Sequence, residues 1–444
     1  MPVSAARAAA FDILLRVEQQ EAYASQLLHS PRCADLSTAD HALATELVLG
    51  VLRWRSALDA ALAQVSSQPL ARLDPEVLAA LRIGAYQLGW LDRIPPRATI
   101  HESVELVKRA GKRWAAPFAN AVLRKLPGVL PRGDQRMQLM RSAATPETLA
   151  AAWAHPEWLI ARWTSQFGIE TTKAICRYDQ SVPATAVRLR TAALEGELRR
   201  DGIELAPGAL LASARRVVSG DVTRTQAFAD GRVAIQDEAS QLVAALVGNG
   251  ARILDCCAAP GGKTLAMADR NPNAEVVAVE LHPHRARDLR QRLAGSNVRV
   301  ICADLKEVPV RRAFDRVLAD VPCHGTGTLA RHPEIKWRLK AEDLADLAMA
   351  QRALLDSALK HVRKGGRLIY STCSLEREQD EAIIEYALHV NRSFHRVDCR
   401  TELEQLREQG ELREVASLLS GPYVRTIPGR HGCDGFFVAV LARI

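Results

Sequence analysis

The chain has 444 residues, of which 48% are hydrophobic, 25% charged and 5% aromatic. Because a single hydrophobic core stops growing at roughly 250 to 300 residues, this length predicts two or three domains. The composition is that of a soluble globular protein, and no apolar run approaches the roughly 18 to 20 residues of a membrane helix, which excludes a membrane-spanning protein and wholesale disorder. Charged residues between Arg7 and Glu18 interrupt any signal-peptide core, so we expect a cytosolic protein.

The charge indicates a class of binding partner, and the cysteine content bears on disulfides and metal sites. Lys and Arg number 59 against 51 Asp and Glu, a formal net charge of +8, and this weak basic excess favours an anionic partner such as nucleic acid. The nine cysteines form neither a disulfide framework nor a CxxC pair, and no His/Cys cluster has zinc-finger spacing, so no metal site is expected. Cysteine in this chain therefore serves packing or chemistry.

The first third of the chain is predicted to be helical. Apolar residues recur at helical spacing, as at Leu47 and Val51, and turn signals cluster near 128–145, so we predict a helical domain over 1–140. A solvated helix face is the default interpretation of the basic run that ends this domain, and an RNA-facing surface is the alternative. The run, 97–141, contains three acids and ten basic residues: Arg97, Lys108, Arg109, Lys112, Arg113, Arg124, Lys125, Arg132, Arg136 and Arg141.

The next stretch, 145–228, mixes two patterns. The segment HPEWLIARWTSQFG has helical periodicity, whereas ATAVRLR alternates as a short strand does. We expect a small α+β intermediate module here.

From residue 229 to 444, short β-rich runs alternate with helical stretches, which predicts a parallel sheet with helices on both faces. The runs are ARILDCCA, EVVAVE, VRVICAD, FDRVLADVPC and GRLIYSTCS. Open α/β sheets build their sites at the carboxyl ends of the strands. The residues at those ends are Asp255, Glu280, Asp304, Asp320 with Cys323, and Cys373.

The first of these strands leads into a glycine turn, CCAAPGGKT, before a helix expected to begin near Lys263. A P-loop would require glycine where Cys257 stands, and GxGxxG is absent, so neither common phosphate-binding motif is present. Glu280 is placed where an acid can bind both hydroxyls of a ribose, and Asp304 near an adenine. A nucleoside cofactor without an essential phosphate fits, and S-adenosylmethionine is the expected one.

Two strand-end cysteines beside an aspartate indicate a particular chemistry. Carbon 5 of a pyrimidine is too weak a nucleophile to attack a methyl sulfonium, and a thiolate that adds to carbon 6 activates it. Asp320, as a carboxyl kept protonated by its site, could stabilise the charge pushed into the ring. The residues alone leave Cys323 and Cys373 interchangeable as the nucleophile.

Three motifs, CCAAPGGKT, DVPCHGTG and STCS, resemble motifs I, IV and VI of the RNA 5-methylcytosine methyltransferases, the Nop/Sun family. The stretches RVAIQDEAS, RHPEIKW and DGFFVAVL are also similar to this family, and the N-terminal region resembles the NusB antitermination factor. The resemblance implies a Rossmann-like class I α/β methyltransferase domain at 229–444. An all-α NusB-like RNA-binding domain and the small α+β module would precede it.

The resemblance also implies roles for individual residues. Cys373 would be the nucleophile, Cys323 would assist release of the product, and Asp320 would contact the target cytosine. Glu280 would bind the ribose of S-adenosylmethionine and Asp304 its adenine side. The methionine portion would lie against the backbone of Cys257, Ala258, Ala259, Pro260, Gly261, Gly262 and Lys263.

Two residues depart from the family pattern. His324 follows Cys323 where a small Ser is usual, and it could act as a base or fill the pocket wall. Glu280 stands where Asp is common, a change that moves the carboxylate only slightly.

The expected substrate is a cytidine of small-subunit (16S) ribosomal RNA, with no obligate protein partner. Because phosphate contacts from Lys and Arg dominate nucleic-acid affinity, this substrate favours the RNA-facing interpretation of the basic run 97–141. Methylation of transfer RNA or large-subunit rRNA would use the same catalytic residues. A third hypothesis is a non-catalytic RNA-binding or antitermination factor, which the intact motifs disfavour. Trp114, Trp337 and Tyr370 could each stack on RNA or pack inside the fold.

Overall fold

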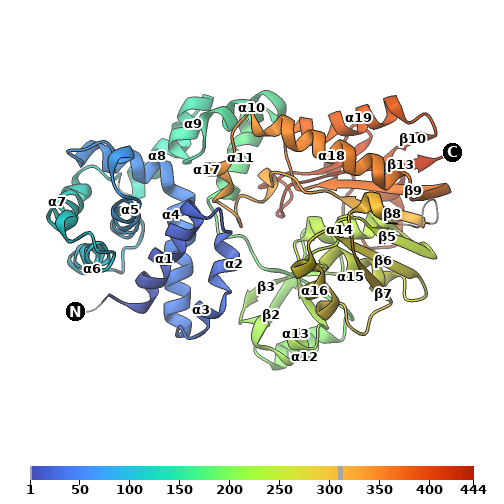
Figure 1. The fold of residues 1–444 in the computed structure, drawn as a ribbon, viewed down its shortest axis with the longest axis horizontal. Coiled ribbons are helices and arrows are strands. Elements are labelled where there is room, and N and C mark those ends of the chain that lie inside the picture. Colours follow the sequence, from blue (N-terminus) through green and yellow to red (C-terminus); the bar gives the residue numbers. More distant parts are fainter. Residues whose placement is uncertain (1–2, 132, 309–313) are drawn as a thin grey trace. The chain divides into compact units, whose positions relative to one another are not determined.

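The computed structural model describes residues 3–131, 133–308 and 314–444, which fold into two compact units (Figure 1). Unit 1 comprises Met1–Val182 and Leu329–Arg338, and unit 2 comprises Pro183–Thr328 and Leu339–Ile444. The predicted module at 145–228 is thus shared between the two units, because its helices belong to unit 1 and its strands to unit 2.

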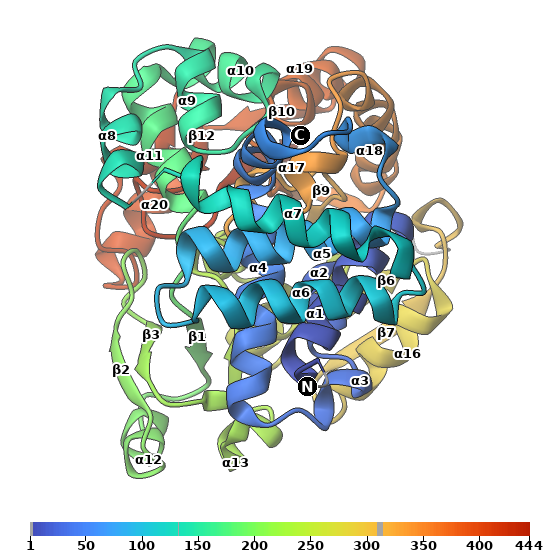
Figure 2. The same ribbon diagram turned by 90° about the vertical axis from the view of Figure 1, so that its left-hand side faces the viewer.

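The described part of unit 1 is helical, as the sequence predicts for the first third. Its longest helix, α4 (Thr38–Val65), is capped by the side chain of Ser37 and packs against α1 (Ala5–Gln19) and α5 (Pro75–Trp90) through buried leucines and valines. Figure 2 shows α5 beside two further helices, α6 and α7. The remaining helices are α2 (Ala24–Leu28), α3 (Pro31–Ala34), α6 (Pro96–Arg109), α7 (Ala116–Lys125), α8 (Gly133–Ser142), α9 (Pro146–Ala152), α10 (Glu157–Phe167), α11 (Ile169–Asp179) and α17 (Ile335–Arg338).

Unit 2 begins with a small antiparallel sheet of order β2-β3-β1-β4. The predicted strand ATAVRLR is β1, and its Val187 is fully buried against Leu198 and Val222. The elements are β1 (Ala186–Leu189), α12 (Leu194–Arg200), β2 (Glu204–Pro207), β3 (Ala214–Ser219), α13 (Gln226–Ala229) and β4 (Val233–Ile235).

The main sheet of unit 2 has the order β11-β12-β13-β9-β8-β5-β6-β7, with β10 paired to β13. The five predicted strands are its parallel half: β5 (Arg252–Asp255), β6 (Glu275–Glu280), β7 (Val298–Cys302), β8 (Phe314–Asp320) and β9 (Val362–Thr372). This confirms the Rossmann-like fold. The sequence did not predict the antiparallel half: β10 (Phe394–Val397), β11 (Leu419–Ser420), β12 (Tyr423–Thr426) and β13 (Phe436–Arg443).

Helices cover both faces of this sheet (Figure 1). Successive strand residues point to opposite faces, so Leu318 packs toward α14 and α15, whereas Val317 and Ala319 pack toward α18 and α19. The helices are α14 (Glu238–Val247), α15 (Gly262–Arg270), α16 (Pro283–Arg292), α18 (Asp343–Leu359), α19 (Glu381–Val390) and α20 (Cys399–Glu408). Both faces of each central strand are therefore buried, and the strand ends are left to form a site.

The described ranges contain neither a membrane-spanning helix nor a cluster of metal-binding side chains. None of their helices combines the length and apolar character that a membrane span requires. Within the same ranges, no three His, Cys, Asp or Glu side chains are grouped so that they could hold a metal ion.

Candidate active site

Four parallel strands bring the predicted site residues to one edge of the sheet. Asp255, Glu280 and Asp320 are the last residues of β5, β6 and β8, and Cys373 follows β9 directly. Pairing of Asp320 with Ser371 aligns the ends of β8 and β9. Because carboxyl ends of parallel strands meet at the same edge, the fold places these chemically active groups around one point.

The glycine turn after β5 is held tightly against the neighbouring strand. Gly261 adopts a left-handed φ of 101°, and a Cβ atom there would lie 2.7 Å from the Leu289 side chain, so only glycine fits. Ala258 N–H donates to the carbonyl of Val279 on β6. Helix α15 begins at Gly262, as the sequence predicts.

Asp255 holds the glycine turn in place through hydrogen bonds. Its carboxylate accepts hydrogen bonds from the Thr264 hydroxyl (2.7 Å) and the Cys257 N–H (3.3 Å). Burial raises the pKa of Asp255 to about 6, although the Thr264 hydrogen bond opposes the shift. Asp255 therefore supports the backbone of the turn and does not project from it.

Glu280 and Asp304 are both placed at strand ends but differ in exposure and local role. Glu280 is 5% exposed, and its Oε1 accepts from the His282 N–H at 2.9 Å. Asp304 is half-buried and caps the short 3₁₀ helix Leu305–Glu307 through the Lys306 N–H. Glu280 is thus a buried carboxylate beside the glycine turn, whereas the side chain of Asp304 already has a structural use.

The two cysteines lie side by side. Cys323 Sγ is 3.1 Å from Cys373 Sγ and accepts the Cys373 N–H at 3.2 Å. The hydrogen bond to Cys373 and then burial raise the pKa of Cys323, which keeps it a thiol at neutral pH. A reactant placed at this point would meet both sulfur atoms.

Asp320 is fixed from two sides. One carboxylate oxygen accepts from the Ser371 hydroxyl at 2.7 Å, and the other lies 2.7 Å from Lys263 Nζ. Burial would lower the pKa of Lys263, but Asp320 outweighs that effect and the pKa is raised. The Lys263 ammonium also lies over the Phe436 ring (4.8 Å) and interacts electrostatically with Cys373. A carboxylate and ammonium pair therefore borders the sulfur atoms, where the sequence had suggested a lone protonated carboxyl.

His324, the departure after Cys323, is held by a buried amide. Gln379 donates from Nε2 to His324 Nδ1 at 2.5 Å and accepts the His324 N–H at 3.3 Å. Burial lowers the pKa of His324, so the ring is neutral and Nδ1 acts as an acceptor. This contact favours the structural interpretation of His324.

Sequence reasoning missed the side-chain partners of the site. Lys263 was expected to act through its backbone, and Ser371 and Gln379 were not singled out. A further buried contact, Gln351 Nε2 to the Pro322 carbonyl (2.8 Å), supports the Cys323 segment from α18. The signal available was weak, because polar residues inside or beside apolar runs are common.

The three candidate stacking aromatics have different environments. Tyr370 is fully buried and its hydroxyl donates to the Gln379 carbonyl at 2.7 Å, and Trp337 donates to the Leu52 carbonyl at 2.6 Å. Both are packing residues. Trp114, in contrast, is 69% exposed between α6 and α7.

The basic run near Trp114 is partly neutralised. Lys108, Arg109 and Lys112 form ion pairs with Glu105, Asp12 and Asp74, and Arg136 lies over the Trp90 ring at 4.5 Å. Arg132 lies outside the described residues. Within 97–131, four exposed cations form no ion pair with another residue that the structure describes: Arg97, Arg113, Arg124 and Lys125.

Comparisons with known proteins match both units. A family model described as 16S rRNA methyltransferase RsmB/F matches residues 244–442, and a NusB family model matches 4–127. The chain is 33% identical to a probable ribosomal RNA small subunit methyltransferase B of Bacillus subtilis, over 100% of both chains. It is 32% identical to the ribosomal RNA small subunit methyltransferase B of Pseudomonas syringae, over 91% of this chain and 90% of that one. Among solved structures, a methyltransferase homolog from Pyrococcus horikoshii aligns with a TM-score of 0.55 at 25% identity, over 66% of this chain and 97% of that one.

Proposed function

The chain belongs to the RsmB/F family of 16S rRNA methyltransferases, and from this premise we propose that it methylates carbon 5 of a cytidine in small-subunit ribosomal RNA. The observation that supports this chemistry is the pair of sulfur atoms 3.1 Å apart beside Asp320. The N-terminal helices to residue 140 would bind RNA, and residues 229–444 would carry out the transfer. Residues 145–228 would join the two.

The methyl donor that fits this site is S-adenosylmethionine, which supplies an electrophilic methyl group. The Glu280 carboxylate is buried, accepts the His282 N–H through Oε1 and has Oε2 4.0 Å from Arg285 Nη1, and a carboxylate at this strand end suits a ribose diol. The turn from Cys257 to Lys263, which tolerates only glycine at position 261, would hold the methionine portion. Asp304 would border the adenine while it caps its helix.

Cys373 would open the reaction by giving up its thiol proton to solvent and attacking carbon 6 of the cytosine as a thiolate. The new S–C6 bond moves the electron pair of the C5=C6 double bond toward carbon 5 and the ring. Asp320 would accept a hydrogen bond from the cytosine amino group. Its partner Lys263 is the proton-bearing group that would stabilise charge at ring N3 and on the developing thiolate.

Once carbon 5 carries the methyl group, the covalent adduct must be resolved. Cys323 would accept the C5 proton, the C5=C6 double bond would re-form, and the S–C6 bond would break to release Cys373 as a thiolate. The pKa of Cys323 is raised first by its hydrogen bond with Cys373. That hydrogen bond is lost once Cys373 is bonded to carbon, so the pKa of Cys323 falls in the adduct. Its thiol then gives up its proton to solvent more readily, and the resulting thiolate accepts the proton from carbon 5.

The test is to incubate the full chain with labelled S-adenosylmethionine and ribosomal RNA, and to map the labelled atom. We expect label on carbon 5 of a small-subunit cytidine. Label on a ring nitrogen, a ribose or the protein would overturn the carbon-5 mechanism. Label on transfer RNA or large-subunit RNA, with small-subunit RNA unlabelled, would keep the mechanism and change the substrate.

Replacing Glu280 with glutamine is expected to weaken S-adenosylmethionine binding. Hydrogen bonds to a charged group contribute about 1.5 to 3 kcal/mol, so the dissociation constant should rise roughly 10- to 150-fold. Calorimetric titration of the full chain measures it. Glu275→Gln, at the exposed start of the same strand where Glu275 pairs with Arg252, is the matched control. Equal affinities in both variants would remove Glu280 from the donor site.

Replacing Trp114 with alanine is expected to weaken binding to ribosomal RNA by about 5- to 150-fold, because stacking of a base on an aromatic ring contributes roughly 1 to 3 kcal/mol. Four exposed basic residues of the same stretch, Arg97, Arg113, Arg124 and Lys125, would supply phosphate contacts. Filter binding at fixed salt measures the effect, and Val218→Ala, at an exposed apolar residue of unit 2, is the control. Unchanged affinity in Trp114→Ala would mean that RNA does not use this surface.

A further inference from the structure

The segment 329–338, which we call the strap, lies in unit 1 although the residues on both sides of it belong to unit 2. It contains the RHPEIKW stretch and ends in the short helix α17. Its first residue directly follows Thr328, the last residue of the segment 321–328, which we call the Cys323 loop. The proposed catalytic roles leave this stretch without a function.

Two hydrogen bonds join the strap to helix α4. Trp337 Nε1 donates to the Leu52 carbonyl at 2.6 Å, and Arg53 donates to the Ala330 carbonyl at 2.9 Å. Both contacts use backbone carbonyls, whose positions are set by the fold of the helix or of the strap itself. The strap is therefore held at its start and near its end.

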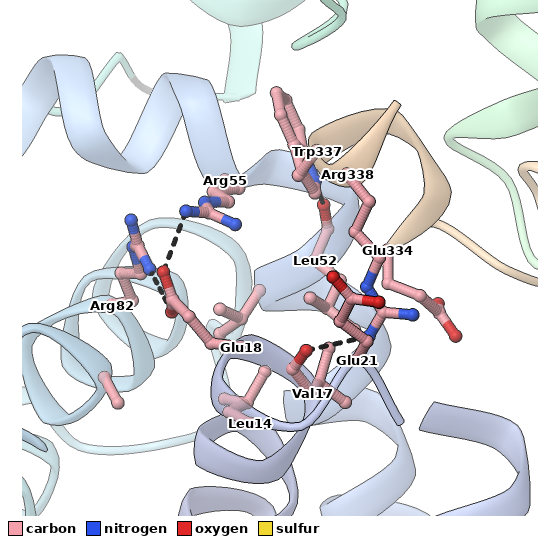
Figure 3. Close-up of a pocket in the computed structure, with 12 residues that line it drawn as sticks. Leu14, Val17, Glu18, Glu21, Leu52, Arg55, Arg82, Glu334, Trp337 and Arg338 are labelled. Atoms are coloured by element: carbon pink, nitrogen blue, oxygen red, sulfur yellow. Dashed lines mark hydrogen bonds and ion pairs between the residues drawn. The ribbon is translucent and has the colours of Figure 1, made fainter. Parts of the chain in front are cut away.

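The end of helix α1 and the start of α2 hold the strap from a second side. Arg338 donates to the carbonyls of Val17 (2.8 Å) and Ala22 (2.6 Å), and Ala24 N–H donates to Glu334 Oε1 at 2.9 Å. Figure 3 shows Trp337 and Arg338 with Leu52 and Val17 at the edge of a cavity of about 210 Å³. Each of these contacts joins residues far apart in the sequence.

Lys336 is the most unusual residue of the strap. It is 1% exposed, and its Nζ donates to the carbonyls of Arg53 and Ala154, both at 3.0 Å. Burial lowers its pKa to about 7, although the nearby Asp179 carboxylate opposes the shift. Ala154 has a positive φ of 50°, a strained conformation for alanine. A lysine thus binds a strained turn and a helix at one point.

The energetic cost of Lys336 indicates a purpose beyond stability. Replacing a buried charge by a well-packed apolar side chain is often neutral or stabilising. Stability alone therefore does not explain a buried lysine at this position. What an ammonium supplies and a leucine does not is a directional contact with two fixed carbonyls. Such contacts fix the strap in one position, which we call its seat.

The Cys323 loop is fixed just before the strap begins. Gly327 N–H donates to the Cys373 carbonyl (2.9 Å), and its own carbonyl accepts from the Gly435 N–H (2.7 Å). A Cβ atom on Gly327 would lie 2.2 Å from the Gly435 carbonyl oxygen, so the loop fits closely. Leu329 follows Thr328 without a spacer, so the strap continues directly from the loop that carries Cys323.

We propose that Lys336 is a positioning residue for product release, because the strap that it seats holds the Cys323 loop with Cys323 beside Cys373. The proposal rests on the proposed function, in which Cys323 resolves the adduct on Cys373. Displacement of a reacting group by about 1 Å can cost roughly 100-fold in rate. An unseated strap therefore slows release, while the first methyl transfer by Cys373 proceeds.

The first experiment compares Lys336→Met with Lys340→Met, an exposed lysine just beyond the strap. With enzyme in excess over ribosomal RNA, first-turnover methylation by Lys336→Met should stay within about 3-fold of the parent, whereas multiple turnover falls about 10- to 100-fold. The covalent protein–RNA adduct should accumulate on denaturing gels. Lys340→Met should match the parent in all three measurements.

The second experiment needs no RNA and separates the strap from the proposed chemistry. Hydrogen exchange of the peptide spanning 321–328 should be faster in Lys336→Met and unchanged in Lys340→Met, because loss of the seat loosens the loop. Trp337→Phe, which keeps the ring but loses its bond to Leu52, should show a smaller effect in the same direction. This variant also serves if Lys336→Met does not fold.

The outcomes are distinct. Unchanged exchange together with normal turnover overturns the proposal. Equal loss of first and multiple turnover without adduct also overturns it, since that pattern denotes a merely structural lysine. If the parent protein forms neither methylated RNA nor adduct, the proposed function fails. Unchanged hydrogen exchange in Lys336→Met would then also reject the positioning role of the strap. Faster exchange would keep the strap as the element that fixes the Cys323 loop.

Discussion

Replacing Cys373 with alanine is expected to abolish methyl transfer, with kcat lowered by about 10⁴-fold or more, the size of effect seen when a nucleophile is removed. Without a sulfur bonded to carbon 6, carbon 5 of cytosine does not become enamine-like. The remaining sulfur, Cys323, enters from the loop after β8 and is held as a thiol by its raised pKa. Incorporation of label from S-adenosylmethionine into ribosomal RNA is the measurement.

The control for Cys373→Ala is Cys399→Ala. Cys399 is fully buried on α20, and burial raises its pKa to about 12, so its thiol is inert. This variant should lose some stability and retain methylation by its folded fraction. Full activity in Cys373→Ala, or an RNA adduct that forms through Cys323, would show that the roles of the two cysteines are assigned wrongly.

The central half of the sheet could be predicted because its strands are buried on both faces. Such strands are short apolar runs that end abruptly at a polar residue, as EVVAVE ends at Glu280. Once the five runs are known to be parallel, their carboxyl ends must converge. The sequence alone therefore predicts that Asp320, Cys323 and Cys373 lie together.

The antiparallel strands β10 to β13 could not be predicted on the same basis. They pair through β13 with β9, and β13 is itself a long apolar run that could equally form a buried helix segment. Strand β11 has only two residues. Their place is decided by partners across the sheet, and no local pattern contains that information.

The contacts that refine the site were also beyond the sequence. Ser371 and Asp320 are 51 residues apart and meet only because β8 and β9 are aligned. The ion pair between Lys263 and Asp320 depends on how the first turn of α15 packs beside β8. Its effect is to replace the expected neutral carboxyl by a charged pair, which changes where the mechanism finds its proton.

The contacts of the RHPEIKW stretch are also beyond prediction from local sequence, because they join residues even further apart in the chain. Trp337 and Leu52 are separated by 285 residues, and nothing in either local sequence indicates that they meet. The stretch was noted only for its family resemblance. Burial of Lys336, an amphipathic residue that usually keeps its charge in water, is the kind of exception that only packing reveals.

Replacing Cys323 with alanine is expected to leave the first methyl transfer largely intact and to trap the enzyme on its RNA. Cys373 keeps its position directly after β9 and the nearby Lys263–Asp320 pair, so the S–C6 bond still forms. The group that accepts the C5 proton is missing, and elimination of Cys373 cannot follow. Multiple turnover should fall by about 100- to 10,000-fold, the usual contribution of a general base.

The trapped species distinguishes this role from a general loss of activity. A covalent adduct that survives denaturing electrophoresis should contain methylated RNA and disappear in the double variant Cys323→Ala/Cys373→Ala. Cys323→Ser tests the proton transfer itself, because the hydroxyl fits the same space but is a far weaker acid and a poorer base near neutral pH. Adduct should therefore accumulate in Cys323→Ser too. Normal turnover in Cys323→Ser would assign the release step to another group, and absence of adduct in both variants would place Cys323 outside it.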